Sequence, residues 1–477
     1  MDKILTLGVI KEKILTKSSI KLIFINKIVY FNSYYDNDTI IINGGLLMFK
    51  NITKIISIIL LSFSISTALK AETVIKVADF QAGVGGITSS YADFITEFEA
   101  ANPGVTVEYT QYTVVTYNEY LKPALSSGSG PDVFAVYPGP DVDDVVSAGH
   151  LLNLTDAIDD EWKGWLGNNI NIPELNRDGK MYMAPQDAFT EEIWVYKDMI
   201  ADLGFELPAF GDSYTVDEWI EISNAAKAKD LDGLMFGPVE QWCVFDGFAN
   251  YVQQGNPDYP TDSLGLALDG KISWDQPMFR DALMAYKKMH DAGVWRADSL
   301  GMDYQVQAWG KWIDREGVGI YCNGDWFISS APADHNTADN LNIFMMSYPK
   351  IAKDSPATYN KATGTNLGVN ANSKNLDLAL AFLRLTQSPK ASETFASYGQ
   401  IPANLASVNM DQLAASPNLL FNDGIKMLAT EGRNTNIYYS QADEMKALYD
   451  GVMEMFLGVT TIDEIVKKMN KVTGYNG

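Results

Sequence analysis

The 477-residue sequence contains little cysteine and histidine, with two Cys and three His. No spacing of these residues matches a zinc site, so no metal centre is expected. The sequence also lacks positive charge, because 36 Lys and Arg face 60 Asp and Glu for a net charge of -24. A phosphate backbone attracts surfaces rich in Lys and Arg, so no nucleic-acid partner is expected. In an exported protein Cys243 and Cys322 could form one disulfide or remain buried thiols, and the sequence leaves both open.

Long apolar runs are scarce, and one short run lies near the N-terminus. Residues 48–71 combine Lys50 and Lys54 with an apolar stretch from Ile55 to Ile65 and a small residue, Ala71. This order predicts a secretory signal peptide cleaved before Glu72. The stretch is shorter than the roughly 20 apolar residues of a membrane-spanning helix, and no cysteine stands at the cleavage site for a lipid. We therefore expect a periplasmic protein with no direct membrane anchor.

Residues 1–47 precede this signal and are dominated by Ile, Lys and Asn. No helix or strand period persists along them. Gly44 to Leu47, just before Met48, could be encoded by a ribosome-binding sequence ahead of the true start codon. We interpret residues 1–47 as a mis-annotated extension, a hypothesis that the codons at these positions test.

The chain after the signal alternates strand and helix patterns. Thr73 to Asp79 is rich in β-branched residues and enters a glycine-rich turn. Apolar residues then recur at helical spacing up to Asn102-Pro103-Gly104, and a second alternating strand begins at Val105. This order predicts an α/β lobe with parallel strands. Beyond Pro185 the patterns are more helical, with capping boxes at Thr215 to Glu218 and Thr461 to Glu464.

Two motifs suggest chemistry that their details do not support. Gly83-Val84-Gly85 follows a strand as a dinucleotide fingerprint does, but Thr88 stands where the third glycine belongs. We predict no cofactor there, and instead a helix N-terminus whose amides face a cleft. Glu191 and Glu192 are neighbours on a predicted strand and so point to opposite faces, which excludes them as a glycosidase pair. With no nucleophile elbow, HExxH or P-loop, the protein is not expected to be an enzyme.

Seven segments together resemble the family 1 extracellular solute-binding proteins of ABC importers, the family that includes maltose-binding proteins. The resemblance runs from Tyr91 to the C-terminus with the segments in the family's order. They are FEAANPGVTV (98–107), GPDVF (130–134), GHLLNLT (149–155), GKMYMAP (179–185), WVYKD (194–198), NGDW (323–326), and 366–385 with Ser388-Pro389. Each is weak alone, and seven in order are specific.

The resemblance implies a type II periplasmic-binding-protein fold, an α/β fold of two lobes joined by three hinge crossings that close around a ligand. Matching the segments places the crossings near 185–188, 367–370 and 401–403. The N-terminal lobe then comprises residues 72–186 and 368–402, and the C-terminal lobe comprises 187–367 and 403–477. The expected function is to deliver a sugar or related polyhydroxylated solute to the permease subunits of an ABC importer, as a monomer.

The resemblance also implies ligand-binding residues. Trp326 of NGDW occupies the position of the family's sugar-stacking tryptophan, and Asp325 beside it is also expected to bind the ligand. Trp242 follows Glu240 where an aromatic follows a ligand-binding glutamate in maltose-type proteins. Four further positions belong to the implied set, of which the last is ambiguous: Tyr137 after GPDVF, Asp187 near a hinge, Gln81 after the first strand, and an aromatic that is one of Tyr438, Tyr439 and Tyr449. Aromatic rings cover the C–H face of a sugar, while carboxylates and amides bind its hydroxyls.

Three alternative functions remain open at this stage. An acidic and aromatic cleft could bind a polyamine or another cationic solute. A secreted carbohydrate hydrolase would need two carboxylates at catalytic separation across one cleft. A surface adhesin or sensor partner could use the same fold. A panel of sugars and amines, a turnover assay and the neighbouring genes separate these alternatives.

Overall fold

The structure is a computed structural model. It describes residues 17–24, 27–36, 39–42, 45–47, 73–137, 140–167, 175–337, 339–404, 408, 419–430, 432–435, 437, 439 and 441–476. The chain divides into two compact units, Met1–Glu72 and Thr73–Gly477. The predicted signal peptide, residues 48–71, lies outside the described residues.

The first unit contains an antiparallel sheet in the order β1-β2-β3-β4, formed by β1 (Lys17–Phe24), β2 (Lys27–Asp36), β3 (Thr39–Ile42) and β4 (Gly45–Leu47). The expectation that residues 1–47 carry no strand pattern was wrong for these segments. Their β-branched and aromatic residues favour strands, and Ile20 with Phe31 and Leu22 with Val29 are backbone partners in the antiparallel register. That residues 1–47 precede the true start codon stays a prediction.

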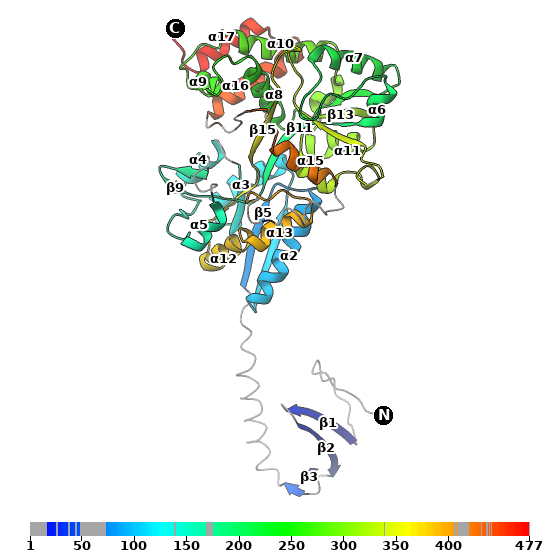
Figure 1. Cartoon of the computed structure of the whole chain (residues 1–477). Coiled ribbons are helices and arrows are strands. Elements are labelled where there is room, and N and C mark those ends of the chain that lie inside the picture. The colour runs from blue at the N-terminus through cyan, green and yellow to red at the C-terminus, as the bar shows by residue number, and fades with distance from the viewer. Residues whose placement is uncertain are drawn as a thin grey trace. The chain divides into compact units, whose positions relative to one another are not determined.

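The N-terminal lobe of the second unit is built on a five-stranded sheet in the order β10-β16-β7-β5-β6. Its strands are β5 (Thr73–Asp79), β6 (Val105–Gln111), β7 (Val133–Val136), β10 (Ala184–Pro185) and β16 (Asn366–Val369). Strands β5, β6 and β7 are mutually parallel as predicted, whereas β16 pairs antiparallel with both of its neighbours, β7 and β10. Helices α2 (Gly85–Ala101), α3 (Val114–Ser126), α4 (Pro140–Ser147), α5 (Asp160–Leu166), α12 (Leu376–Thr386) and α13 (Pro389–Ser397) complete this lobe (Figure 1).

Helix α2 shows how the sequence produces this lobe. Tyr91, Phe94 and Phe98 are buried on one face, as their helical spacing predicts. The helix ends at Ala101 with Asn102 as its C-cap, and the next residue, Pro103, lacks the N–H needed to continue it. At its N-terminus Val84 provides no side-chain cap. The first amides of α2 therefore need acceptors from elsewhere in the protein.

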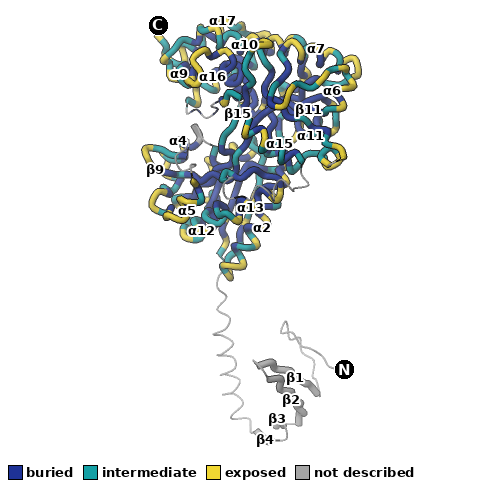
Figure 2. The backbone as a smooth tube through the Cα atoms, viewed as in Figure 1, coloured by how far each residue is buried: buried dark blue, intermediate teal, exposed yellow. Residues whose placement is uncertain are grey.

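The C-terminal lobe is built on a six-stranded sheet whose path is β12-β13-β11-β15-β17, with β14 also paired to β11. Its strands are β11 (Ala188–Tyr196), β12 (Asp232–Met235), β13 (Gly317–Gly324), β14 (Ile343–Met346), β15 (Thr358–Thr363) and β17 (Arg433–Asn434). Its helices include α6 (Lys197–Asp202), α7 (Val216–Lys227), α8 (Trp242–Gly255), α9 (Ser263–Leu268), α10 (Pro277–Asp291), α11 (Trp309–Ile313), α15 (Leu419–Leu428), α16 (Ala442–Phe456) and α17 (Ile462–Val472). Short helical turns are η3 (Ala297–Gly301), η4 (Tyr304–Ala308), η5 (Asp325–Ser330) and η6 (Ala333–His335). Buried residues fill the interior of both lobes (Figure 2).

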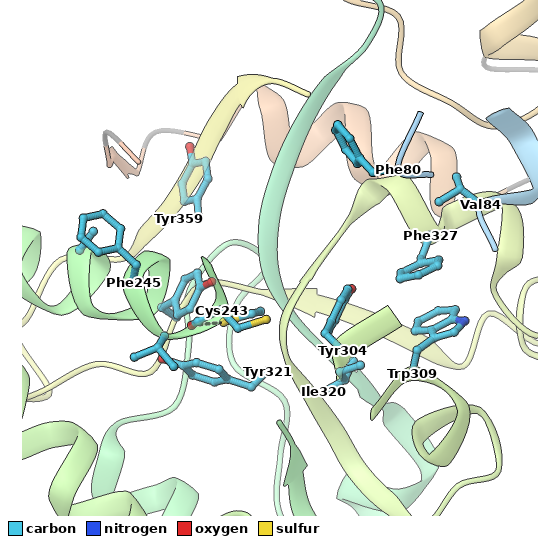
Figure 3. Packing of buried hydrophobic residues seen from close by; sticks show 14 of the residues in the cluster. Phe80, Val84, Cys243, Phe245, Tyr304, Trp309, Ile320, Tyr321, Phe327 and Tyr359 are labelled. Atoms are coloured by element: carbon cyan, nitrogen blue, oxygen red, sulfur yellow. Dashed lines mark hydrogen bonds between the residues drawn. The ribbon is translucent and has the colours of Figure 1, made fainter. Parts of the chain in front are cut away.

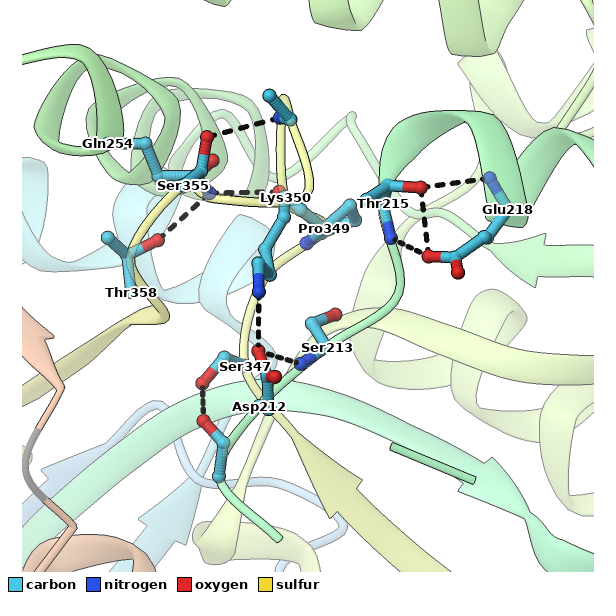
Figure 4. A network of polar contacts seen from close by, with 12 residues as sticks. Asp212, Ser213, Thr215, Glu218, Gln254, Ser347, Pro349, Lys350, Ser355 and Thr358 are labelled. Atoms are coloured by element: carbon cyan, nitrogen blue, oxygen red, sulfur yellow. Dashed lines mark hydrogen bonds and ion pairs between the residues drawn. The ribbon is translucent and has the colours of Figure 1, made fainter. Parts of the chain in front are cut away.

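Both predicted capping boxes in this lobe are confirmed. The Thr215 hydroxyl accepts from the amide of Glu218 at 3.2 Å, and the Glu218 carboxylate accepts from the amide of Thr215 at 2.7 Å (Figure 4). Thr461 and Glu464 form the same arrangement at the start of α17. Close to the first box, Lys350 pairs with Asp212 at 3.1 Å. The two boxes satisfy the first amides of α7 and α17.

The chain crosses between the lobes next to Asp187. The first crossing lies between β10 and β11, at residues 186–187. The second lies between β15 and β16, at 364–365, slightly earlier than the expected 367–370, because β16 belongs wholly to the N-terminal sheet. A Cβ on Gly364 would lie 2.6 Å from Asp187 Oδ1, so this close approach requires glycine. The third crossing begins at Pro402, which bridges Asp187.

Within the described residues, no helix is both long and apolar enough to cross a membrane.

Candidate functional site

A cavity of about 510 Å³ lies between the two lobes. Six of the seven residues named above as the main ligand candidates line it: Trp326, Trp242, Tyr137, Asp187, Glu240 and Gln81. Asp325 does not line it. Of the three aromatic candidates near the C-terminus, Tyr449 lines the cavity, Tyr439 is buried with its hydroxyl on Asp262, and Tyr438 lies outside the described residues. Residues more than 300 positions apart therefore meet in one site.

Two tryptophans from the C-terminal lobe form the main aromatic surface of the cavity. The Trp242 and Trp326 rings are nearly perpendicular, at 80°, with centroids 5.9 Å apart. Trp242 is the first residue of α8, and Trp326 stands in η5 directly after β13. Both side chains are half-buried, which leaves part of each ring facing the cavity. Two perpendicular faces can cover two sides of a ring-shaped ligand.

The residues around Trp326 hold its ring in place. Its Nε1 donates to the Tyr304 hydroxyl at 3.2 Å, and Phe189 packs edge-on at 5.3 Å. The ring lies against Gly324, where a Cβ would come within 2.2 Å of it, so the NGDW motif requires glycine at this position. Below this layer, Phe327 stacks on Trp309 at 4.1 Å beside Tyr304 (Figure 3). The ring therefore rests on a packed aromatic layer.

Asp325 supports this arrangement from behind the cavity wall. Its Oδ2 accepts from the amide of Thr190 at 2.9 Å and from the Thr190 hydroxyl at 3.1 Å. Burial raises the pKa of its carboxyl well above the ordinary range. These bonds join η5 to β11. The geometry gives Asp325 a structural contact, while Trp326 next to it faces the cavity.

The N-terminal lobe contributes a thinner wall. Tyr137 stacks on Phe80 with centroids 4.5 Å apart, and both rings line the cavity. Gln81 Nε2 donates to the hydroxyl of Thr365 in the second crossing. The backbone amide of Gln81 donates to Asp79 Oδ1 at 2.9 Å. Gln81 thus links the end of β5 to the hinge.

Asp187 lies at the hinge with its carboxylate directed at the second crossing. Its Oδ1 accepts from the amide of Thr365, and its carbonyl accepts from the amide of Gly364 at 2.9 Å. Burial raises the pKa of Asp187 to about 7, against the hydrogen bond from Thr365, which lowers it. The carboxyl therefore holds two crossings together at the edge of the cavity.

Glu240 orients other cavity residues. Its Oε2 accepts from Trp242 Nε1 at 3.0 Å, and its Oε1 accepts from the amide of Gln305 at 3.0 Å. Burial raises its pKa, and these two bonds oppose that shift. Both oxygens thus have protein donors. The carboxylate fixes the Trp242 ring and the start of η4 together.

Two acidic residues on the cavity surface were missed as ligand candidates. Glu191 had been considered only as half of a catalytic pair, and the structure places it in the cavity while Glu192 bonds Trp194 Nε1 outside it. Asp246 lies one helical turn after Trp242, and this i, i+4 spacing was the available signal. The two carboxyl groups are hydrogen-bonded to each other.

Three further residues missed from the sequence join the lobes directly. Gln305 Oε1 accepts from the amide of Val114 at 2.7 Å, and its Nε2 donates to the carbonyl of Phe80 at 3.0 Å. Ser330 Oγ and Ser329 Oγ accept from the amides of Gly85 and Gly86 at 3.0 and 2.8 Å. The two serines therefore cap α2 from the opposite lobe. The predicted role of this helix start, amides facing the cleft, is confirmed, and the acceptors are protein hydroxyls.

Cys243 and Cys322 are free, buried thiols beneath the cavity. Cys322 Sγ contacts the carbonyl of Cys243 at 2.8 Å. This contact connects the start of α8 to the end of β13. Across the part of the chain that the structure describes, no group of three His, Cys, Asp or Glu side chains could hold a metal ion.

The fold and the cavity define the class as two-lobed α/β binding proteins with an interlobe site. The sequence profile of the bacterial extracellular solute-binding proteins matches residues 85–393, and the chain belongs to that family. No curated protein matches the sequence.

Solved structures similar to this chain support the same fold. One, from a study of xylan utilisation by the thermophilic bacterium Caldanaerobius polysaccharolyticus, is 19% identical, with a TM-score of 0.70 over 84% of this chain and 99% of its own. A chitin oligosaccharide binding protein is 20% identical, with a TM-score of 0.67 over 84% and 98%. The maltose/maltodextrin-binding domain from Bdellovibrio bacteriovorus, bound to maltotriose, is 18% identical, with a TM-score of 0.64 over 84% and 99%.

Proposed function

We propose that this protein is the exported binding subunit of an ABC importer and captures a sugar or related polyhydroxylated solute between its lobes. The observation that carries the proposal is the pair of perpendicular tryptophans facing a cavity that also exposes carboxyl and amide groups. Apolar faces and hydrogen-bonding edges are the two features of a sugar ring, and the cavity offers a partner for each. The sugar ligands named for two similar structures support the same reading.

The proposal includes the route of delivery and the state of the protein. After cleavage before Glu72, the protein acts as a monomer in the periplasm. Ligand binding closes the lobes, and the closed form is recognised by the permease subunits. The crossings near Asp187 provide the hinge, and the Gln305 and serine contacts stabilise the closed form. The protein catalyses no reaction, because its role ends with release of the intact solute.

A thermal-shift screen of the purified protein tests the proposal. The screen includes monosaccharides, disaccharides, polyols, amino acids and acyclic diamines at pH 7.5. A ligand at 100 times its Kd stabilises the folded protein by about 2.7 kcal/mol, so a true ligand raises the melting temperature clearly. Stabilisation by a saccharide or polyol supports the proposal. Stabilisation only by diamines or amino acids contradicts it.

A further inference from the structure

We propose that Glu191 and Asp246 form a subsite for the amino group of the ligand, so that the solute is a sugar with a free amine. The inference rests on the proposed function and narrows its substrate class. It depends on which hydrogen-bond donors the protein provides to each carboxyl group of the cavity.

Glu240 and Glu191 have protein donors on both carboxylate oxygens. For Glu240 these donors are Trp242 and Gln305. For Glu191, the Tyr348 hydroxyl donates to Oε1 and Asn360 Nδ2 donates to Oε2 at 2.7 Å. These donors oppose the rise of the Glu191 pKa to about 7 that burial causes, and they fix the position of its carboxyl group. Asp187 is similarly held by the amide of Thr365.

Asp246 differs because, among the described residues, the one hydrogen-bond partner of its carboxyl group is Glu191. The residue is 5% exposed and lines the cavity. A deeply buried carboxyl without an outside donor keeps its proton, and here that proton is donated to Glu191. Burial and the charge of Glu191 accordingly raise the pKa of Asp246 well above the ordinary range. The pair therefore presents one negative charge and one exchangeable proton to the cavity.

Among the described residues, no positively charged side chain is bonded to this pair. The side chains that respond electrostatically to Asp246 are uncharged when protonated: Tyr137, Tyr348, Tyr439 and Cys322. Among the described residues that line the cavity, Lys446 is the one lysine or arginine, and its Nζ lies 2.8 and 2.7 Å from the two carboxylate oxygens of Asp450. Its charge is thus already paired. A positively charged group on the ligand would therefore give the pair the cationic partner that the protein does not provide.

The aromatic wall favours a cation attached to a ring. Trp242 precedes Asp246 by one turn of α8, so the indole and the carboxyl project from the same side of the helix. A pyranose stacked on the tryptophans could direct an ammonium group toward Asp246. The ammonium replaces the shared proton, which passes to solvent, and both carboxylates then bind the cation. A neutral sugar leaves the proton in place.

The test compares sugars that differ at one substituent. Glucosamine, galactosamine and mannosamine are titrated calorimetrically at pH 7.5 beside the parent hexoses and the N-acetyl forms, with putrescine as an acyclic amine. We expect at least one amine to bind about 10-fold more tightly than both of its neutral counterparts, a difference of about 1.4 kcal/mol. Titrations in phosphate and Tris buffers, which differ in ionisation enthalpy, should show a net release of protons with the amine and none with the hexose.

Two variants separate a ligand contact from a structural effect. Asp246→Asn preserves the shape and neutrality of the protonated acid, so it should fold normally while the preference for the amine falls to within about 3-fold. Glu192→Gln changes a buried carboxyl on the other face of β11 and should leave the preference unchanged. If Asp246→Asn unfolds the protein, the proton count of the unmodified protein still decides the inference.

The outcomes distinguish this inference from the proposed function. If neutral hexoses or N-acetyl sugars bind as tightly as the amines, or if amine binding releases no proton, the amino subsite is wrong while the sugar-binding function stands. If putrescine binds and no sugar does, the proposed function itself is wrong.

Discussion

The two lobes contribute differently to the same cavity. The C-terminal lobe supplies both tryptophans and the acidic residues Glu191, Glu240 and Asp246, whereas the N-terminal lobe supplies Tyr137, Gln81 and the exposed start of α2. The C-terminal surface is held rigidly by bonds within its own lobe. The N-terminal surface is joined to it by contacts that must break when the lobes open. Recognition therefore belongs mainly to one lobe, and closure depends on bonds to the other.

The strongest test of this difference is Trp326→Ala. Loss of roughly 100 Å² of apolar contact at about 25 cal/mol per Å² weakens binding by about 2.5 kcal/mol, or roughly 70-fold. Calorimetric titration with the best sugar from the screen measures this loss. Trp165→Ala is the control, because Trp165 is half-buried in the N-terminal lobe and does not line the cavity. If Trp326→Ala instead lowers the melting temperature of the unliganded protein sharply and keeps its affinity, the tryptophan is structural.

A smaller effect is expected from Gln305→Ala, which removes two bonds between the lobes while leaving both tryptophans in place. Two net hydrogen bonds contribute about 1 to 2 kcal/mol to the closed form, so apparent affinity should fall roughly 5- to 30-fold. Small-angle scattering should show a larger radius of gyration for the variant at subsaturating ligand. Val306→Ala, the exposed neighbouring residue, should change neither quantity. Unchanged affinity in Gln305→Ala would mean that closure does not depend on this side chain.

The double variant Ser329→Ala/Ser330→Ala tests the caps that α2 receives from the opposite lobe. Loss of an N-cap costs about 0.5 to 2 kcal/mol, and here only the closed form loses it. Apparent affinity should therefore fall roughly 2- to 30-fold, with little change in the melting temperature of an open, unliganded protein. Ser147→Ala, on the exposed side of α4, is the matched control. A loss of stability without a loss of affinity would show that the serines support the fold alone.

The most gradual effect is on stability against pH. Burial raises the pKa of Asp79 to about 6 and those of Asp187 and Glu191 to about 7, above their unfolded values. The folded protein thus binds more protons than the unfolded chain from about pH 4 to 7, and its stability falls as pH rises through that window. The unliganded protein should melt at a higher temperature at pH 5 than at pH 7.5. Asp187→Asn should reduce the difference, and a higher melting temperature at pH 7.5 would contradict these shifts.

Local patterns were sufficient to predict several parts of the molecule. The apolar face of α2 and the boxes at Thr215 and Thr461 depend on residues within one or two turns, so short spacings encode them. Trp326 and Trp242 were found through motifs that the resemblance placed in order. These predictions needed no knowledge of which segments meet in space.

Long-range contacts could not be predicted in the same way. Gln305 joins the lobes only because η4 lies against the end of β5 and the start of α3, which are about 200 residues earlier in the chain. Asp325 lies inside the NGDW motif beside Trp326, but its bonds to Thr190 direct its side chain away from the cavity. The second crossing is fixed by the close approach of Gly364 to Asp187, which no local period reveals.

The most direct test of the whole account is a crystal structure of the protein with the best sugar from the screen. The account predicts one sugar enclosed between the lobes, with a ring face on Trp326 or Trp242. The sugar should make polar contacts to the acidic residues of the C-terminal lobe, and the bonds of Gln305 to Val114 and Phe80 should be intact. A sugar bound outside the interlobe cavity, or inside it without contact to either tryptophan, would contradict the account.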